Sequence, residues 1–126
     1  MTERQSGHVI DASGPPERET GGILSINLSV LVANWRELGS RAAPAQCAAV
    51  VKADGYGCGI APVAAALASA GCGTFFVADL AEARCLRRIA PAATVYVLNG
   101  LAPGSAEAFA EADLWPVISS PAELAE

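Results

Sequence analysis

The sequence contains a single lysine, Lys52, and the residues around it are suited to amine chemistry. Lys52 follows an apolar run, residues 48–51, and precedes a glycine-rich segment, residues 53–59. A primary amine at the end of a buried strand can form a Schiff base, because partial burial lowers the pKa of a lysine and makes its neutral, nucleophilic form accessible. The alternative is that the side chain extends to solvent, as a lone lysine at a strand end usually does.

The segment after Lys52 combines turn-forming glycines with a phenol. Gly55, Gly57 and Gly59 allow the backbone to turn tightly and to approach a ligand closely. Tyr56, four residues beyond Lys52, could donate a hydrogen bond to an anion such as a phosphate held beside the lysine, although a tyrosine in such a loop is more often a packing residue. The glycine spacing matches neither the P-loop nor G-x-G-x-x-G, so it does not predict nucleotide binding.

The elements that must position these residues follow a strand–helix repeat. Apolar runs predict strands at residues 23–26, 47–51, 74–78, 94–98 and 114–118. Helical spacing, caps and prolines predict helices that begin near residues 28, 62, 80, 105 and 120, the first three ending at Gly39–Pro44, Gly71 and Pro91. Uninterrupted apolar strands are typical of a parallel sheet that is buried on both faces and covered by helices.

This repeat predicts an α/β fold, either a (β/α)8 TIM-like barrel or an open doubly wound sheet. A barrel takes about 250 residues, so these 126 residues would supply about its first half, with parallel strands and outer helices. In both architectures function gathers at the carboxyl ends of strands, where Lys52 lies. We expect residues 1–22 to form a flexible tail and residues 23–126 to form the barrel portion. A capping box at Ser120, shortly before Glu126, predicts that the chain is incomplete.

The bulk composition argues against several functions. A net charge of -5 does not suit a nucleic-acid surface, and the cluster of Arg84, Arg87 and Arg88 is expected to form a solvated helix face. No apolar run approaches the roughly 20 residues of a membrane span, and the first residues lack a hydrophobic signal core, so we expect a cytoplasmic location.

The cysteines do not suggest a metal site. None of the four forms a C-x-x-C pair, and only His8 could join them as a nitrogen ligand, so neither a zinc site nor a disulfide framework is predicted. Cys47, Cys72 and Cys85 are interpreted as small buried apolar residues.

Residues 50–59, Val-Val-Lys-Ala-Asp-Gly-Tyr-Gly-Cys-Gly, resemble the pyridoxal-phosphate lysine motif of bacterial alanine racemases. Residues 26–29, 76–83 and 95–100 are also similar to that family, so the resemblance covers about residues 23–126. The family has an amino-terminal eight-stranded barrel and a carboxyl-terminal β domain, and its chains form a head-to-tail homodimer.

The resemblance implies a pyridoxal 5'-phosphate-dependent isomerase that interconverts L- and D-alanine. Lys52 would form the internal aldimine and act as one of two bases, Tyr56 would hydrogen-bond the cofactor phosphate, and Val50 and Leu98 would line the cofactor pocket. In the family the second base is a tyrosine from the partner subunit's carboxyl-terminal domain, so we expect the isolated chain to be inactive or nearly so. Tyr96, inside a predicted strand, is expected to pack rather than to replace it.

The chain departs from the family motif at several positions. Asp54 and Cys58 stand where asparagine and histidine are common, and Asp54 would disfavour a nearby phosphate if it pointed inward. Cys58 is more readily interpreted as a packing residue than as a reactive thiol.

Other functions stay open, because a fold does not determine a reaction. Related barrels carry amino-acid decarboxylases, D-amino-acid aldolases and a non-catalytic cofactor carrier. A non-enzymatic alternative is a half-barrel that uses its exposed edges to dimerise into a full barrel.

Overall fold

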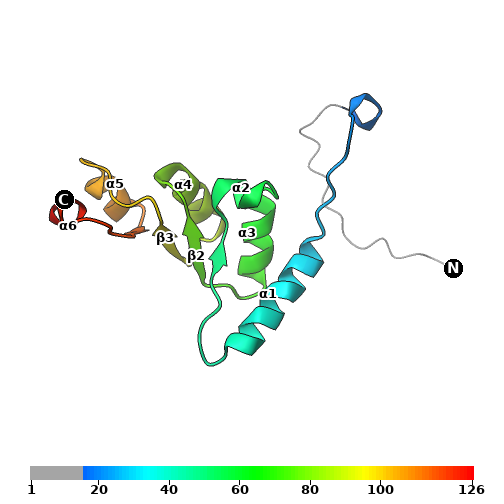
Figure 1. Ribbon diagram of the computed structural model, residues 1–126, viewed down its shortest axis with the longest axis horizontal. Coiled ribbons are helices and arrows are strands. Elements are labelled where there is room, and N and C mark those ends of the chain that lie inside the picture. The colour runs from blue at the N-terminus through cyan, green and yellow to red at the C-terminus, as the bar shows by residue number, and fades with distance from the viewer. Residues whose placement is uncertain (1–15) are drawn as a thin grey trace.

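A sheet of four parallel strands lies at the centre of the structure, a computed structural model that describes residues 16–126 (Figure 1). The strands are β1 (Ala49–Val50), β2 (Thr74–Val77), β3 (Thr94–Val97) and β4 (Trp115–Pro116). Each strand pairs with its sequence neighbour, in the order β1-β2-β3-β4. The carboxyl ends of all four therefore lie at one edge of the sheet, which is the edge where the functional residues were expected.

Helices connect the strands as the strand–helix repeat predicts. They are η1 (Glu17–Glu19, a 3-10 turn), α1 (Leu28–Ala42), α2 (Lys52–Tyr56), α3 (Ile60–Ser69), α4 (Leu80–Ile89), α5 (Ala106–Glu111) and α6 (Pro121–Ala125). Side-chain caps begin three of them, because Asn27, Asp79 and Ser120 each accept a hydrogen bond from a backbone N–H in the first turn. The expected parallel α/β fold is confirmed.

Several predicted boundaries were wrong. Residues 23–26 form no strand, since no neighbouring strand lies beside them to pair with their backbone. Helix α3 begins at Ile60 rather than at Pro62, whereas α1 ends at Ala42, within the expected range Gly39–Pro44. The expected tail falls mostly on residues 1–15, which lie outside the described residues.

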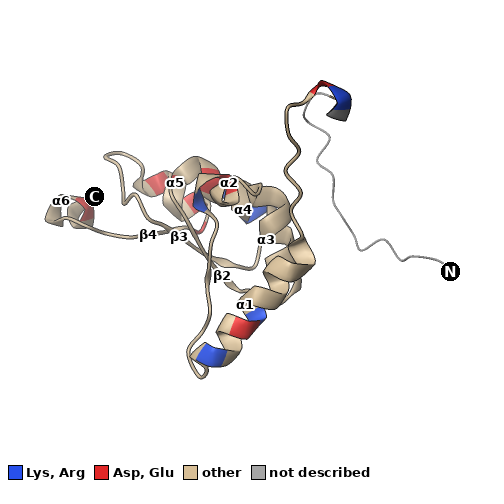
Figure 2. Ribbon diagram, turned by 45° about the vertical axis from the view of Figure 1, so that its right-hand side comes forward, with Lys and Arg blue, Asp and Glu red and all other residues tan. Residues whose placement is uncertain are grey.

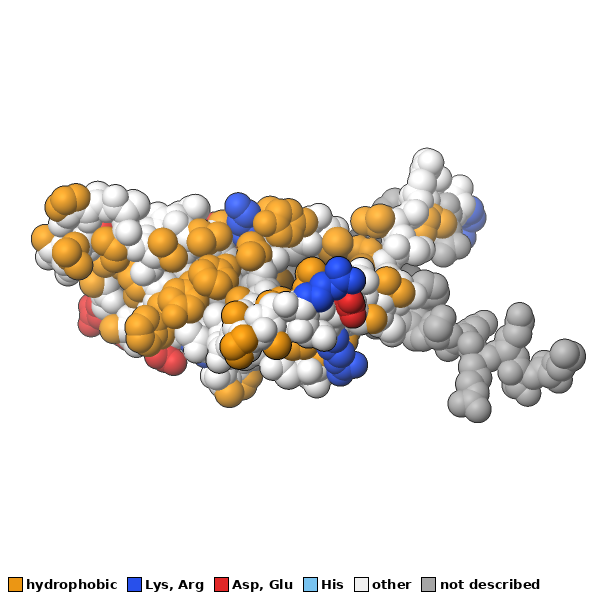
Figure 3. Space-filling model, turned by 60° about the horizontal axis from the view of Figure 1, so that its bottom comes forward, with side chains coloured by type: hydrophobic (Ala, Val, Ile, Leu, Met, Phe, Trp, Pro, Cys, Tyr) orange, Lys and Arg blue, Asp and Glu red, His pale blue; other side chains and the backbone are white. Residues whose placement is uncertain are grey.

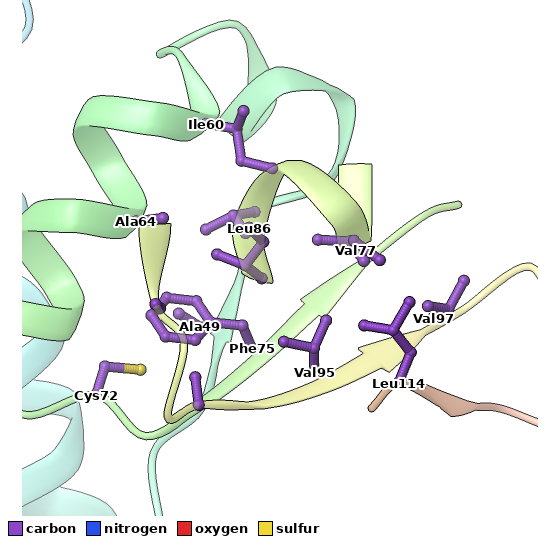
Figure 4. Close-up of a cluster of buried hydrophobic side chains, with 14 of the residues drawn as sticks. Ala49, Ile60, Ala64, Cys72, Phe75, Val77, Leu86, Val95, Val97 and Leu114 are labelled. Atoms are coloured by element: carbon purple, nitrogen blue, oxygen red, sulfur yellow. The ribbon is translucent and has the colours of Figure 1, made fainter. Parts of the chain in front are cut away.

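The helices bury one face of the sheet. Alternate residues of the strands point toward them, and Phe75, Val77, Val95 and Val97 have almost no exposed surface (Figure 4). Residues from α3, α4 and α5 complete this core: Ile60, Val63, Ala64, Leu67, Ala83, Leu86 and Phe109. Burial on this scale is the main source of the stability of the fold.

The cysteines take the packing roles that were expected of them, to different degrees. Cys72 is buried in the core, and burial raises the pKa of its thiol. Cys47, Cys58 and Cys85 are half-buried, and Cys58 and Cys85 pack against the core. Residues 16–126 contain no group of His, Cys, Asp and Glu side chains placed to hold a metal ion.

The opposite face of the sheet is uncovered within residues 16–126, as expected for outer helices that pack on one side of a partial barrel. Val50, Phe76, Tyr96 and Trp115 are paired in register across the four strands and form one row on this face. Val50 is 46% exposed and Trp115 is 56% exposed. The rings of Phe76 and Tyr96 stack with centroids 4.9 Å apart, as expected for a packing role of Tyr96. A band of hydrophobic side chains is visible across one side of the molecule (Figure 3).

Charged residues lie on the helices and loops and are absent from the strands (Figure 2). Arg84 and Arg88 are exposed as predicted, but Arg87 is not part of a solvated face. The Arg87 side chain is only 18% exposed, and its guanidinium donates hydrogen bonds to backbone carbonyls near the amino ends of β3 and β4. In the described part of the chain, no helix combines the length and apolar character needed to cross a membrane.

Candidate functional site

Lys52 lies where the sequence places it, at the carboxyl end of β1. It is the first residue of α2 and follows Val50 by two positions, the spacing of side chains that share a face of a strand. The residue is half-buried, and within residues 16–126 its side chain takes part in no ion pair or hydrogen bond. An amine in this position is therefore available to a ligand at the carboxyl edge of the sheet.

The segment after Lys52 is a left-handed turn rather than an ordinary helix. Ala53, Asp54, Gly55 and Tyr56 have φ values of 51°, 52°, 63° and 56°, and Gly57 continues at 79°. The N–H of Gly55 donates to the carbonyl of Val51 at 2.9 Å, and that of Gly57 to the carbonyl of Ala53 at 3.0 Å. Glycine adopts this conformation freely, as expected, but each L-residue in it costs roughly 1–2 kcal/mol.

Three non-glycine residues in one such turn were not anticipated from the sequence. Backbone strain of this kind persists only where the surroundings hold it, and it is concentrated at functional sites. The turn directly follows Lys52 and connects the end of β1 to α3. Its contacts with the rest of the protein therefore decide where Lys52 lies.

Asp54 fixes one side of this turn. Its carboxylate accepts a hydrogen bond of 2.8 Å from the N–H of Ile60, the first residue of α3. A carboxylate at the amino end of a helix is favourable, because the unpaired N–H groups there carry partial positive charge. Asp54 is thus engaged by α3, and the disfavoured inward orientation is not the one in the structure.

Glu82 fixes the other side and was not singled out from the sequence. Its carboxylate accepts hydrogen bonds from the N–H of Asp54 at 3.2 Å and from the N–H of Ala78 at 2.9 Å. The signal that could have found it is the spacing of Asp79 and Glu82, which is that of a capping box. Glu82 joins the connections that follow β1 and β2, so it links the lysine turn to the neighbouring strand.

The predicted apolar residues lie on the same edge. Leu98 follows β3 directly, and its N–H donates to the carbonyl of Val77 at 2.9 Å. The alternation of side chains places Leu98 on the uncovered face with Tyr96 and Val50. Lys52 and Leu98 are two strands apart, about 10 Å, and the intervening strand end carries only the methyl group of Ala78.

Tyr56 lies at the end of the left-handed turn and is 64% exposed. Its phenol is therefore free of the core, which does not support the alternative that Tyr56 is a packing residue. Lys52, Val50 and Leu98 are brought to one edge of one sheet, and Tyr56 borders it from the turn. The shallow hollow of about 340 Å³ between α1 and α3 lies elsewhere and includes none of the four residues.

Parallel strands in the sequential order β1-β2-β3-β4, with helices on one face, are the arrangement of part of a (β/α)8 barrel, whose functional groups lie at the carboxyl ends of the strands, as Lys52 does. Residues 26–126 match the family described as alanine racemase, N-terminal domain. The alanine racemase of Methylobacterium nodulans is 57% identical over 106 residues, which are 84% of this chain and 29% of that protein. The chain belongs to the alanine racemase family.

Solved structures agree with this assignment. The alanine racemase of Bartonella henselae, with covalently bound pyridoxal phosphate, matches with a TM-score of 0.76 and 38% identity over 78% of this chain and 29% of that one. The alanine racemase of Corynebacterium glutamicum gives a TM-score of 0.70 and 34% identity over 76% and 28% of the two chains. The chain spans about 29% of the length of the first curated relatives it matches.

Proposed function

We propose that this chain is part of a pyridoxal-phosphate-dependent racemase of alanine, in which Lys52 carries the cofactor. The observation behind the proposal is the half-buried, unpaired Lys52 amine at the carboxyl edge of a sheet whose sequence matches the alanine racemase family. The relatives named above are alanine racemases, which favours this reaction over decarboxylation, aldol cleavage or cofactor transport.

The residues present fit the cofactor. A primary amine is the group that binds an aldehyde covalently, and the exposed Tyr56 phenol is a suitable donor to a phosphate. Val50 and Leu98 offer apolar surface to a planar ring, and Ala78 between their strands leaves the face open. The Asp54 carboxylate accepts a hydrogen bond from the N–H of Ile60, at the amino end of α3, where partial positive charge offsets part of its own.

In this proposal Lys52 has two tasks, to carry the cofactor and to move a proton, and the other residues have one each. Pyridoxal phosphate, when bound, accepts the electrons that remain when the α-proton of the amino acid leaves. Lys52 Nζ removes or returns that proton on one face of the substrate α-carbon, while Tyr56 holds the phosphate and Val50 and Leu98 exclude water. Inversion also needs an acid–base group on the opposite face.

The proposed opposite-face group is a tyrosine of a partner subunit in a homodimer, as the family resemblance implies. Within residues 16–126, Tyr96 shares the uncovered face but its ring is stacked on Phe76. We therefore propose that the isolated chain binds the cofactor yet racemises alanine negligibly.

Reductive trapping tests the role of Lys52. The chain is mixed with near-stoichiometric pyridoxal phosphate, reduced with borohydride and mapped by peptide mass, and an adduct on Lys52 is expected. Lys52→Arg, which keeps the positive charge but removes the primary amine, is the matched control. Labelling confined to the α-amino group of Met1, or appearing only at large cofactor excess, would contradict the proposal.

The same preparation is then supplied with alanine to test the role of the missing second base. No appreciable racemisation is expected from the chain alone. Appreciable racemisation would show that this chain already supplies both acid–base groups.

A further inference from the structure

One carboxylate joins the turn after Lys52 to the connection after β2, beyond the last sheet hydrogen bond, which the N–H of Val51 donates to the carbonyl of Phe76. Glu82, in the first turn of α4, accepts from the N–H of Asp54 through Oε1 and from the N–H of Ala78 through Oε2. Asp54 is two residues beyond Lys52 in the left-handed turn, and Ala78 directly follows β2. One side chain therefore spans the carboxyl ends of two adjacent strands.

The left-handed turn needs such an attachment. Ala53, Asp54 and Tyr56 are L-residues at φ values of 51°, 52° and 56°, a conformation that they leave readily when nothing opposes it. The hydrogen bond from the N–H of Ile60 to the Asp54 carboxylate holds the turn against α3, the helix that directly follows it in the chain. Glu82 holds the turn from a different helix, α4. Its carboxylate is a strong acceptor for two backbone N–H groups at once.

We propose that Glu82 is a positioning residue for Lys52: it locks the left-handed turn against the end of β2 and so fixes the lysine amine at the carboxyl edge of the sheet. The catalytic consequence of this inference rests on the proposed function of Lys52. The locking itself is a property of the turn and can be measured without cofactor.

The chain provides a matched control in Glu123. This residue holds the same position in α6 that Glu82 holds in α4, three residues after the N-cap Ser120. Its carboxylate accepts from the N–H of Ser119 at 3.0 Å, just as that of Glu82 accepts from Ala78. It lies on the connection after β4, and its hydrogen bonds within residues 16–126 go to Ser119 and Ser120 rather than to the lysine turn. A change at Glu123 thus removes the same kind of bond elsewhere.

The experiment compares Glu82→Gln, Glu82→Ala and Glu123→Gln with the unmodified chain by amide hydrogen exchange. The glutamine side chain keeps only one acceptor oxygen. Because the two N–H groups bind different carboxylate oxygens, Glu82→Gln cannot form both hydrogen bonds. We expect exchange in the lysine turn and at Ala78 to become at least about tenfold faster, with core amides such as that of Val95 unchanged. Glu123→Gln should leave the lysine turn unaffected. If Glu82→Ala does not fold, Glu82→Gln alone carries the test.

A second readout follows the lysine directly. The rate at which acetic anhydride modifies Lys52, relative to the α-amino group, should rise in Glu82→Gln and not in Glu123→Gln, because a released turn exposes the amine. Trapping of pyridoxal phosphate on Lys52 should fall in Glu82→Gln at near-stoichiometric cofactor.

The outcomes separate this inference from the proposed function. Unchanged exchange in the turn of Glu82→Gln would overturn the inference, and so would faster exchange throughout the core, which would indicate a general structural role. Absence of trapping on Lys52 in the unmodified chain would count against the proposed function alone. Exchange and acetylation would still decide the role of Glu82.

Discussion

Replacing Arg87 with alanine should destabilise the protein far more than replacing Arg88, the next residue of α4. The two arginines were expected to be equivalent members of a solvated face. In the structure Arg88 is exposed, whereas Arg87 is mostly buried under the turns that lead into β3 and β4. The pair therefore compares the same side chain, on the same helix, in two environments.

The magnitude follows from the bonds that would be lost. The Arg87 guanidinium donates to four backbone carbonyls, those of Ala112 (3.1 Å), Pro91 (2.9 Å), Ala93 (2.6 Å) and Asp113. A hydrogen bond from a charged donor contributes roughly 1.5–3 kcal/mol, but bonds of one network are not additive and water can reach some of the freed oxygens. We expect Arg87→Ala to lower the free energy of unfolding by about 3 kcal/mol. The ion pair with the exposed Asp113 carboxylate, at 3.5 Å, adds little.

Urea denaturation followed by far-ultraviolet circular dichroism measures this difference. Arg88→Ala should change the free energy of unfolding by less than about 0.5 kcal/mol, the usual range for a surface substitution. Arg87→Lys should fall between the two, because one ammonium group cannot reproduce the spread of the guanidinium donors. If Arg87→Ala and Arg88→Ala were equally mild, the carbonyl contacts of Arg87 would not stabilise the fold and the reasoning would be refuted.

Two further predictions concern the lysine turn and α6. Gly55→Ala should cost about 1 kcal/mol of unfolding free energy, since Gly55 has a φ of +63° and an added Cβ would lie 3.4 Å from the N of Ile60. Gly73→Ala, with open space around the added Cβ, is the control, and equal effects in thermal unfolding would argue against strain in the turn. The backbone N–H and the hydroxyl of Ser119 hold the pKa of the Glu123 carboxyl below its ordinary value. The stabilisation by Glu123 is therefore complete above the unfolded pKa and is lost as the pH falls through the lower folded pKa. Glu123→Gln should flatten the acid side of the pH–stability profile, and an unchanged profile would count against this.

The sequence predicts the fold well where local signals and tertiary structure agree. Helix α4 runs from Leu80 to Ile89 and stops before Pro91 as expected, because Asp79 caps it and proline cannot continue it. The strand predicted at residues 23–26 is absent, because apolar composition leads to a strand only if a partner strand lies beside it. The exposure of Val50 could not be predicted for a related reason: an apolar strand residue shows a preference for burial, but the sequence does not show which segment covers it.

The site was predictable in its chemistry and not in its geometry. Lys52 is conspicuous as the only lysine, and its place at the end of β1 follows from the apolar run before it. The left-handed conformation of Ala53 could not be read from the sequence, because an L-residue there gives no local signal and is held by distant groups. Glu82 was missed and Arg87 was wrongly assigned to a solvated face, because helical periodicity assigns a residue to a face but does not reveal which connection lies against it.

The uncovered face also has an optical consequence. The chain has two tryptophans: Trp35 lies on α1, packed against the core, with its indole N–H donating to the carbonyl of Cys47, and Trp115 lies on the uncovered face beside Tyr96. A molecule that covers that face should shift the emission of Trp115 and shield it from a quencher in solution, while leaving Trp35 unaltered. The protein thus contains one intrinsic fluorophore that reports on occupancy of the face and a second that serves as its internal reference.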